Sequence, residues 1–146
     1  MTPRWLPRFT FGVTLAGVAV ATYLTIAHYT TPDVLACSDS GFVNCATVTT
    51  SAQSTFVGIP VAVLGLGWYV AMAVLCAPAA WRSSSLALAR ARVGLSALGV
   101  GFVLWLVYAE LFVIRALCIW CTVVHVLAFA LFATIALFGS SPARDA

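Results

Sequence analysis

Four long apolar segments dominate the sequence and limit the folds that it can adopt. They cover about residues 9–28, 56–77, 93–114 and 117–138, and each is close to the roughly 20 residues that span a bilayer core as a helix. Apolar residues make up 63% of the 146-residue chain, against seven cationic and four acidic side chains, so one soluble core cannot hide them. We therefore predict an all-α integral membrane protein, a single domain over residues 1–146 with four helices in one bundle. The glycines in these segments are predicted to let the helices approach closely; they are Gly17, Gly58, Gly65, Gly67, Gly94, Gly99 and Gly101.

The arginines indicate which way the bundle faces, since the chain contains no lysine. Six of the seven precede the first helix, surround the second connection or follow the fourth helix: Arg4, Arg8, Arg82, Arg90, Arg92 and Arg144. By the positive-inside rule this side is cytoplasmic. We expect a multi-pass protein of the cell membrane, inner or plasma, with both termini in the cytoplasm. The loop over about residues 29–55 and the turn before Cys118 then lie on the outer side.

Four of the five cysteines form two pairs, and both pairs fall on the predicted outer side. Cys37 and Cys45 lie in the outer loop, whereas Cys118 and Cys121 stand at the start of the fourth helix. Paired cysteines persist as disulfides in oxidising compartments and rarely in the cytosol. The pattern therefore favours a membrane thiol–disulfide enzyme. Cys76, at the inner end of the second helix, is predicted to be a packing residue.

The outer loop is polar and rich in small residues, and it is predicted to cover the mouth of the bundle. Turn-forming residues between Cys37 and Cys45, Asp39 among them, make a disulfide across this segment sterically easy. Residues 46–56 have a weak helical pattern, which predicts a short capping helix before the second long helix. Such a loop can close a pocket.

Cys118, Cys121 and His125 are three and four residues apart, which places them along one face of a helix. If this helix begins at Leu117, Cys118 lies in its first turn, where free N–H groups and the helix dipole favour a thiolate. Arg115 adds positive charge nearby. A metal site on this face is an alternative, although it needs a fourth ligand from the loop. His125 is either a packing histidine or a substrate contact.

Glu110 lies about one turn from the outer end of the third helix and has two interpretations. It is an interfacial carboxylate paired with Arg115, or it belongs to a proton path beside the pocket, since reducing a carbonyl acceptor consumes protons. Ionisable groups inside a membrane are functional candidates by default. We slightly prefer the ion pair.

Taken in order, these motifs resemble the vitamin K epoxide reductase family in its bacterial branch. They are the Cys-x7-Cys pair with Ser51 six residues later, Phe-Val-Gly-Ile-Pro at residues 56–60, Glu-Leu-Phe-Val-Ile at residues 110–114, and Cys-Ile-Trp-Cys at residues 118–121. The resemblance covers nearly the whole chain. It implies a four-helix bundle around a quinone, either ubiquinone or menaquinone, with the thiols on the periplasmic or lumenal side.

The resemblance also implies an order for the four cysteines. Cys37 looks like the thiol that exchanges with a thioredoxin-like, DsbA-like partner, Cys45 like the thiol that passes electrons to Cys118, and Cys121 like the thiol facing the quinone ring. Thiolate attack on a disulfide sulfur is the chemical step between cysteine pairs. The implied function is a quinone-dependent oxidoreductase that reoxidises its partner and so supports disulfide formation.

The implied quinone contacts are Ser51, Phe56 and His125. His125 stands four residues after the second motif cysteine, where the vertebrate enzymes have a tyrosine, and the second helix lacks their asparagine. Glu110 and Arg115 are expected to support the site. Neither a metal nor a nucleic acid is expected.

Other functions are compatible with the same residues. Many bacterial members carry a fused thioredoxin-like domain, and here the partner is expected to be a separate protein. A vitamin K epoxide or quinone reductase would use the same thiols, whereas a DsbB-type oxidase has its two cysteine motifs in the reverse order. Outside the enzymes, a non-catalytic membrane assembly or metal-binding protein would use the cysteines as structural staples.

Overall fold

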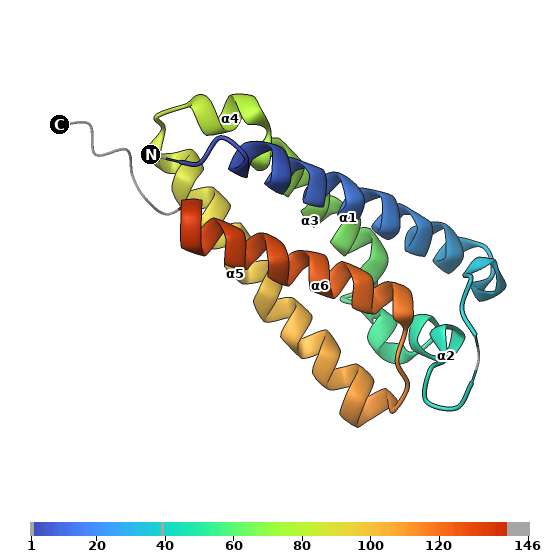
Figure 1. Ribbon diagram of the computed structural model, residues 1–146. Coiled ribbons are helices and arrows are strands. Elements are labelled where there is room, and N and C mark those ends of the chain that lie inside the picture. Colours follow the sequence, from blue (N-terminus) through green and yellow to red (C-terminus); the bar gives the residue numbers. More distant parts are fainter. Residues whose placement is uncertain (1, 39, 140–146) are drawn as a thin grey trace.

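Four helices lie side by side and form the body of the molecule (Figure 1). The computed structural model describes residues 2–38 and 40–139, so Asp39 and Arg144 lie outside the described residues. The four helices are α1 (Leu6–Tyr29), α3 (Val61–Cys76), α5 (Leu86–Tyr108) and α6 (Ile119–Thr134). Helix α1 packs against α3 and α6, and α5 packs against α6 and α3. The prediction of a mostly helical membrane protein is confirmed.

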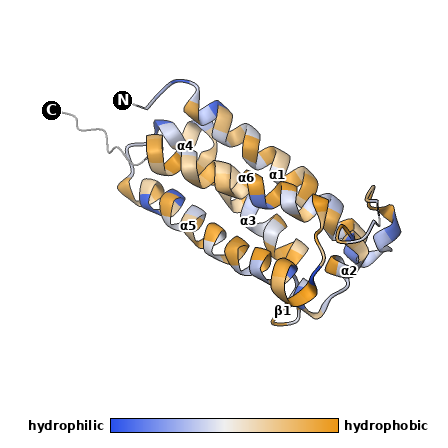
Figure 2. Cartoon of the chain, turned by 60° about the horizontal axis from the view of Figure 1, so that its bottom comes forward, coloured by the Kyte–Doolittle hydropathy of each residue, from blue (hydrophilic) through white to orange (hydrophobic). Residues whose placement is uncertain are grey.

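Three of the described helices are long and apolar enough to cross a membrane. Their apolar stretches are Leu6–Tyr29, Leu86–Ile114 and Ile119–Gly139. Apolar residues predominate along the helices in the view of Figure 2, and many large apolar side chains on them are exposed, as expected for helices surrounded by lipid. Helix α3 has 16 residues and is about 24 Å long, less than the roughly 30 Å of a bilayer core. A fourth membrane span therefore stays a prediction.

A tight hairpin replaces the predicted start of the second long helix. Strand β1 (Thr55–Phe56) pairs with strand β2 (Ile59–Pro60), so the helix predicted from residue 56 begins only at Val61. Val57 and Gly58 connect the strands with φ angles of 53° and 80°, the left-handed conformation that a two-residue hairpin requires. Glycine adopts this conformation freely, whereas a β-branched valine is strained there.

The connection between α3 and α5 is shorter than predicted. It contains one short helix, α4 (Pro78–Arg82), and α5 then begins at Leu86 instead of near residue 93. The side chain of Ser85 accepts a hydrogen bond from the Leu88 N–H and caps the new helix. Arg92, which the sequence places at the second connection, consequently lies within α5 and is only 3% exposed.

The last two long helices both end in wider, π-helical turns. Helix α5 continues as η3 (Ala109–Ile114), and α6 continues as η4 (Ile135–Gly139). Arg115 follows η3 in a left-handed conformation with a φ of 56°, which ends the helix and turns the chain towards α6. Such π turns often mark functional sites in helices.

The outer loop folds over the end of the bundle in three short helical turns. These are η1 (Pro32–Val34), α2 (Cys45–Thr49) and η2 (Ala52–Ser54). The side chain of Asn44 accepts a hydrogen bond from the Thr47 N–H and caps α2. The predicted capping helix is confirmed in place, but it is shorter than residues 46–56 because Ser51 and the hairpin end it.

Only some of the glycines serve the predicted close packing. A side chain at Gly17 would collide with the ring of Tyr69, and one at Gly99 with the ring of Trp68. The prediction is wrong for four others, where a methyl group in place of the hydrogen would meet no heavy atom within 4 Å: Gly65, Gly67, Gly94 and Gly101. Gly58 serves the hairpin turn instead.

Candidate functional site

The first cysteine pair closes the outer loop. Cys37 and Cys45 form a disulfide with their Cα atoms 6.2 Å apart. Cys45 is the first residue of α2 and is only 1% exposed, whereas Cys37 is partly exposed. The half of the disulfide that an outside protein can reach is therefore Cys37.

Backbone hydrogen bonds fasten this loop to the segment in front of α6. Leu117 donates its N–H to the carbonyl of Phe42 at 2.8 Å, and its own carbonyl accepts the N–H of Asn44 at 3.0 Å. These bonds surround a parallel bridge between Val43 and Leu117. Cys45 follows Val43 by two residues, and Cys118 follows Leu117 directly, so the bridge holds the two cysteines near each other along the paired segments.

Both cysteine pairs meet at this junction. Cys45 and Cys118 are buried in the same apolar cluster, and the partly buried Cys37 and Cys121 pack against it. The indole N–H of Trp120 also donates to the carbonyl of Ala36 at 3.1 Å, which ties the loop to the first turn of α6. The fold thereby brings together two cysteine pairs that lie far apart along the chain.

Cys118 is the N-cap of α6, and the helix itself begins at Ile119 instead of at Leu117 as the sequence predicts. The Cys118 sulfur accepts a hydrogen bond from the Cys121 N–H at 3.2 Å, and its carbonyl accepts the hydroxyl of Thr122 at 2.9 Å. A hydrogen bond from the Cys121 thiol, helped by backbone N–H groups of the first turn, lowers the pKa of the Cys118 thiol in spite of its burial. The nucleophilic thiolate therefore forms at a lower pH than in an ordinary cysteine.

A cavity of about 390 Å³ lies between the helices beneath the loop. Cys121 lines it, as do the three predicted quinone contacts Ser51, Phe56 and His125. The rings of Phe56 and Phe102 pack edge to face, with centroids 5.6 Å apart. Most of the remaining wall is apolar, which suits a flat, weakly polar ring with few oriented polar contacts.

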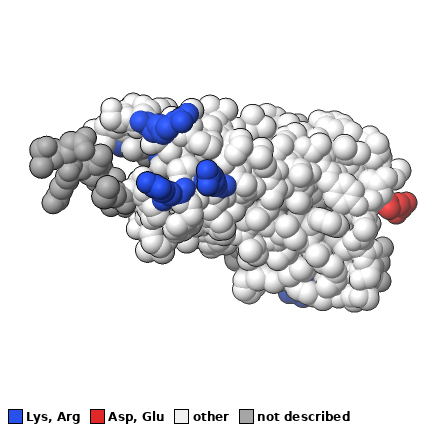
Figure 3. Space-filling model, turned by 45° about the horizontal axis from the view of Figure 1, so that its top comes forward, with Lys and Arg blue, Asp and Glu red and all other residues white. Residues whose placement is uncertain are grey.

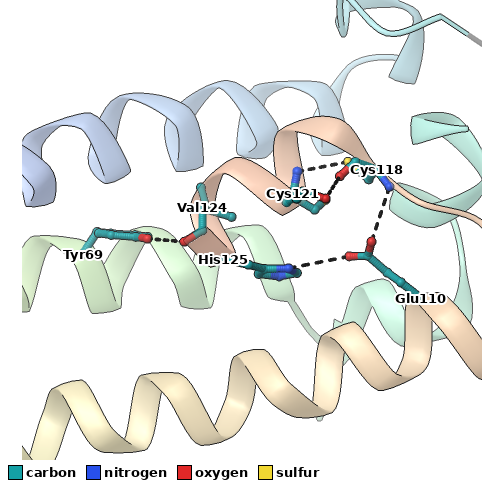
Figure 4. A network of polar contacts seen from close by, with 7 residues as sticks. Tyr69, Glu110, Cys118, Cys121, Val124 and His125 are labelled. Atoms are coloured by element: carbon teal, nitrogen blue, oxygen red, sulfur yellow. Dashed lines mark hydrogen bonds and ion pairs between the residues drawn. The ribbon is translucent and has the colours of Figure 1, made fainter. Parts of the chain in front are cut away.

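Glu110 is a buried wall residue of this cavity and not a surface carboxylate. It is 6% exposed, its Oε2 accepts the Cys118 N–H at 3.4 Å, and its Oε1 lies 4.0 Å from Nδ1 of His125 (Figure 4). Arg115 is exposed, and the described residues contain no ion pair between it and Glu110. The preferred sequence interpretation is therefore wrong, because the π turn directs Glu110 towards α6.

Three wall residues have no recognisable signal in the sequence. Tyr69 donates its hydroxyl to the carbonyl of Val124 (Figure 4), and Trp68 donates its indole N–H to the carbonyl of Leu95 at 2.9 Å. Gln53 belongs to η2 and lines the cavity from the loop side. Tyr69 and Trp68 sit in an apolar helix where any aromatic residue fits the pattern. Their place in the cavity wall becomes visible only from the packing of α3 against α6 and α5.

The described residues contain no group of three or more His, Cys, Asp or Glu side chains arranged to hold a metal ion. Cys118, Cys121 and His125 follow one another at the start of α6, but Cys37 and Cys45 are bonded to each other and so do not supply a fourth ligand. This geometry does not favour the metal alternative. Cys118 and Cys121 are free thiols in the structure.

A known protein family has the same sequence pattern as this chain. The model of the vitamin K epoxide reductase family matches residues 8–136, which include all four paired cysteines and the cavity. No curated protein matches the chain.

Proposed function

The chain belongs to the vitamin K epoxide reductase family, and from this premise we propose that it is a quinone-dependent thiol–disulfide oxidoreductase of the cell membrane. In this proposal it oxidises a separate thioredoxin-like protein on the outer side and passes the electrons to ubiquinone or menaquinone in the cavity. The observation that carries the proposal is the position of Cys121. It lines the cavity and also packs against the cluster that contains Cys45 and Cys118.

The proposed sequence starts at the loop. A thiolate of the reduced partner attacks Cys37, breaks the Cys37–Cys45 bond and leaves as an oxidised disulfide, so that both loop cysteines are thiols. The Cys45 thiolate then attacks Cys118 of the oxidised second pair, which breaks the Cys118–Cys121 bond. When Cys37 displaces Cys118 from this mixed disulfide, the loop disulfide forms again. Each step breaks one S–S bond and forms one, so no other oxidant is needed.

The last step uses the cavity. Cys118 and Cys121 each lose a proton, one S–S bond forms between them, and two electrons and two protons reduce the quinone. The lowered pKa of Cys118 favours this step because the thiolate is the nucleophilic form of the sulfur. The residues Ser51, Phe56 and His125 are proposed to bind the quinone, since they line the same cavity.

The proposed orientation places the site outside the cell. The exposed arginines Arg4, Arg8, Arg82 and Arg90 belong to the end of the bundle where α1 and α5 begin. In the space-filling view most of the visible cationic groups gather at this end, and an acidic group marks the opposite end (Figure 3). By the positive-inside rule the arginine-rich end is cytoplasmic, so the cysteine pairs face the oxidising side.

The proposal is tested on protein purified with its lipids. Extraction should yield a bound ubiquinone or menaquinone, and dithiothreitol should drive the reduction of added decylubiquinone or menadione. Vitamin K epoxide in the same assay decides whether the epoxide is also a substrate. A preparation with neither bound quinone nor dithiol-dependent quinone reduction would instead support a structural role for the cysteines.

A further inference from the structure

Glu110 is placed where it touches both the thiol pair and the cavity. One oxygen accepts the backbone N–H of Cys118 at 3.4 Å, and the other faces Nδ1 of His125 at 4.0 Å. The close-up shows the carboxylate between the start of α6 and the imidazole (Figure 4). Glu110 and His125 are each 6% exposed. A carboxylate held in such a place is costly unless it has a partner or a role.

His125 completes the connection to the cavity. It lies one turn after Cys121 on α6, and both residues line the cavity wall. Its Nδ1 faces Glu110, which leaves Nε2 as the nitrogen that can meet a group in the cavity. Because an imidazole can accept a proton at one nitrogen and release another from the second, His125 can connect Glu110 with such a group.

We propose that Glu110 and His125 form a proton-transfer pair for the quinone step, with His125 as the proton donor and Glu110 as the residue that positions and reprotonates it. This inference rests on the proposed function and assigns the proton path of the same site. Two S–H bonds break and one S–S bond forms at Cys118 and Cys121, while two O–H bonds form on the quinone. His125 gives one proton to a quinone oxygen and regains one from Glu110, which takes up the proton released by Cys118. The proton of Cys121, which lines the same cavity, goes to the other quinone oxygen. Neither residue changes its protonation over a complete turnover.

Other titratable groups surround the pair and have to be considered in any pH response. Tyr69 faces α6 from α3, His28 lines the cavity from α1, and Arg115 follows Glu110 at the end of η3. Cys118 and Cys121 share the start of α6 with His125. In the described part of the chain, Glu110 is the titratable side chain with contacts to both Cys118 and His125.

The first test replaces the carboxylate without removing its hydrogen bond. In Glu110→Gln the amide oxygen still accepts the Cys118 N–H, but the side chain no longer transfers protons. We expect dithiothreitol-driven reduction of decylubiquinone to fall about 100-fold, the usual contribution of general acid–base catalysis, and its pH dependence to flatten. Asp33→Asn, at an exposed carboxylate in η1, is the matched control and should keep both the rate and the pH profile.

The second test does not depend on quinone reduction. In infrared difference spectra between the reduced and the diamide-oxidised protein, the wild type and Asp33→Asn should show the C=O band of a protonated carboxyl group, which Glu110→Gln lacks. A carboxylate with only a structural role stays ionised in both states and gives no such C=O band, although its carboxylate bands shift with the redox state of Cys118. His125→Asn should lose activity by a similar factor, and added imidazole should restore part of it, which provides a test even if Glu110→Gln fails to fold.

Two outcomes contradict the inference while leaving the proposed function intact. One is an active Glu110→Gln protein with the wild-type rate and pH profile. The other is a His125→Asn protein with normal turnover. A His125→Asn protein whose lost turnover imidazole does not restore also contradicts the inference if the infrared band is missing from the wild type. If the wild-type protein itself reduces no quinone with dithiothreitol, the proposed function fails instead.

Discussion

The two ends of the bundle each bury a cysteine beside ionisable groups, but a second thiol, a disulfide and a cavity lie beside only one of these two cysteines. At the end that carries the cysteine loop, called the outer end after its proposed orientation, Cys118 lies at a helix start, next to a second thiol, a disulfide and a cavity. At the inner end Cys76 is packed in an apolar cluster with Met72 and Leu131 and lies beside Thr10 and Arg92. It is a free thiol and does not line the cavity.

The inner cluster is built to hold helices together. The guanidinium of Arg92 donates to the carbonyl of Leu75 at 2.9 Å and to that of Ala80 at 3.4 Å, and it stacks 3.6 Å from the ring centroid of Trp81. These contacts join α5 to the end of α3 and to α4. Among the described residues, Cys76 thus has a charged neighbour but neither a second thiol nor an open cavity beside it, whereas Cys118 has both next to it.

The largest expected difference between the two ends is in turnover. Cys121→Ala should lower dithiothreitol-driven reduction of decylubiquinone by on the order of 1000-fold or more, because removing one member of a catalytic unit removes the function of the unit. Cys76→Ala at the inner end should leave the rate within about twofold of the wild type, since surface and packing changes away from the site do not alter the catalytic unit. Spectrophotometric quinone assays on both variants decide this, and comparable losses would remove the distinction between the ends.

At the outer end, the two cysteine pairs are expected to differ in the electron donor that they serve. Cys37→Ser should abolish oxidation of a reduced thioredoxin-like protein but retain most of the turnover with dithiothreitol, because the small dithiol can reach the second pair directly. The same two donors should be compared in parallel on one preparation. Equal losses with both would show that Cys37 is not the entry point for the protein partner.

The inner cluster should matter for stability instead of turnover. Arg92→Leu leaves the carbonyls of Leu75 and Ala80 without their donor, at a cost of about 2–4 kcal/mol in the free energy of unfolding. Arg90→Leu, on the same helix but exposed, should change it by less than about 0.5 kcal/mol. Thermal unfolding in detergent, with quinone turnover measured on the remaining folded protein, checks both. Equal stabilities would contradict the assigned role of Arg92.

The smallest expected effect concerns the wall of the cavity. In Gly17→Ala the new methyl group collides with the ring of Tyr69, which should cost about 1–3 kcal/mol and raise the KM for decylubiquinone. Gly12→Ala on the same helix has open space around it and should be neutral or slightly stabilising. Unfolding and steady-state kinetics measure both effects; an unaffected Gly17→Ala protein would mean that Tyr69 moves aside without consequence.

The features of the fold that the sequence predicts are those that depend on local composition. Apolar length locates the membrane helices, and turn-forming residues locate the outer loop. The hairpin at Thr55–Pro60 is missed because Phe56, Val57 and Ile59 continue the apolar pattern of the helix after them. The early start of α5 is missed because Arg90 and Arg92 resemble a surface connection.

The site is predictable where spacing along one helix suffices. Cys118, Cys121 and His125 follow one another along α6, and this spacing is visible in the sequence. The partner of Glu110 is not visible there, because Arg115 is nearer in sequence while His125 is nearer in space. The contact of Cys45 with the Cys118 cluster likewise depends on the backbone pairing of Val43 with Leu117.

The central claim is that thiol oxidation at the outer face is coupled to quinone reduction through Cys121. Its most direct test is a measurement of both reactions in proteoliposomes that contain decylubiquinone and a reduced thioredoxin-like protein. The account predicts that one quinone is reduced for each disulfide formed in the partner and that Cys121→Ala stops both reactions. Partner oxidation at an undiminished rate without quinone, or in the Cys121→Ala protein, would contradict it.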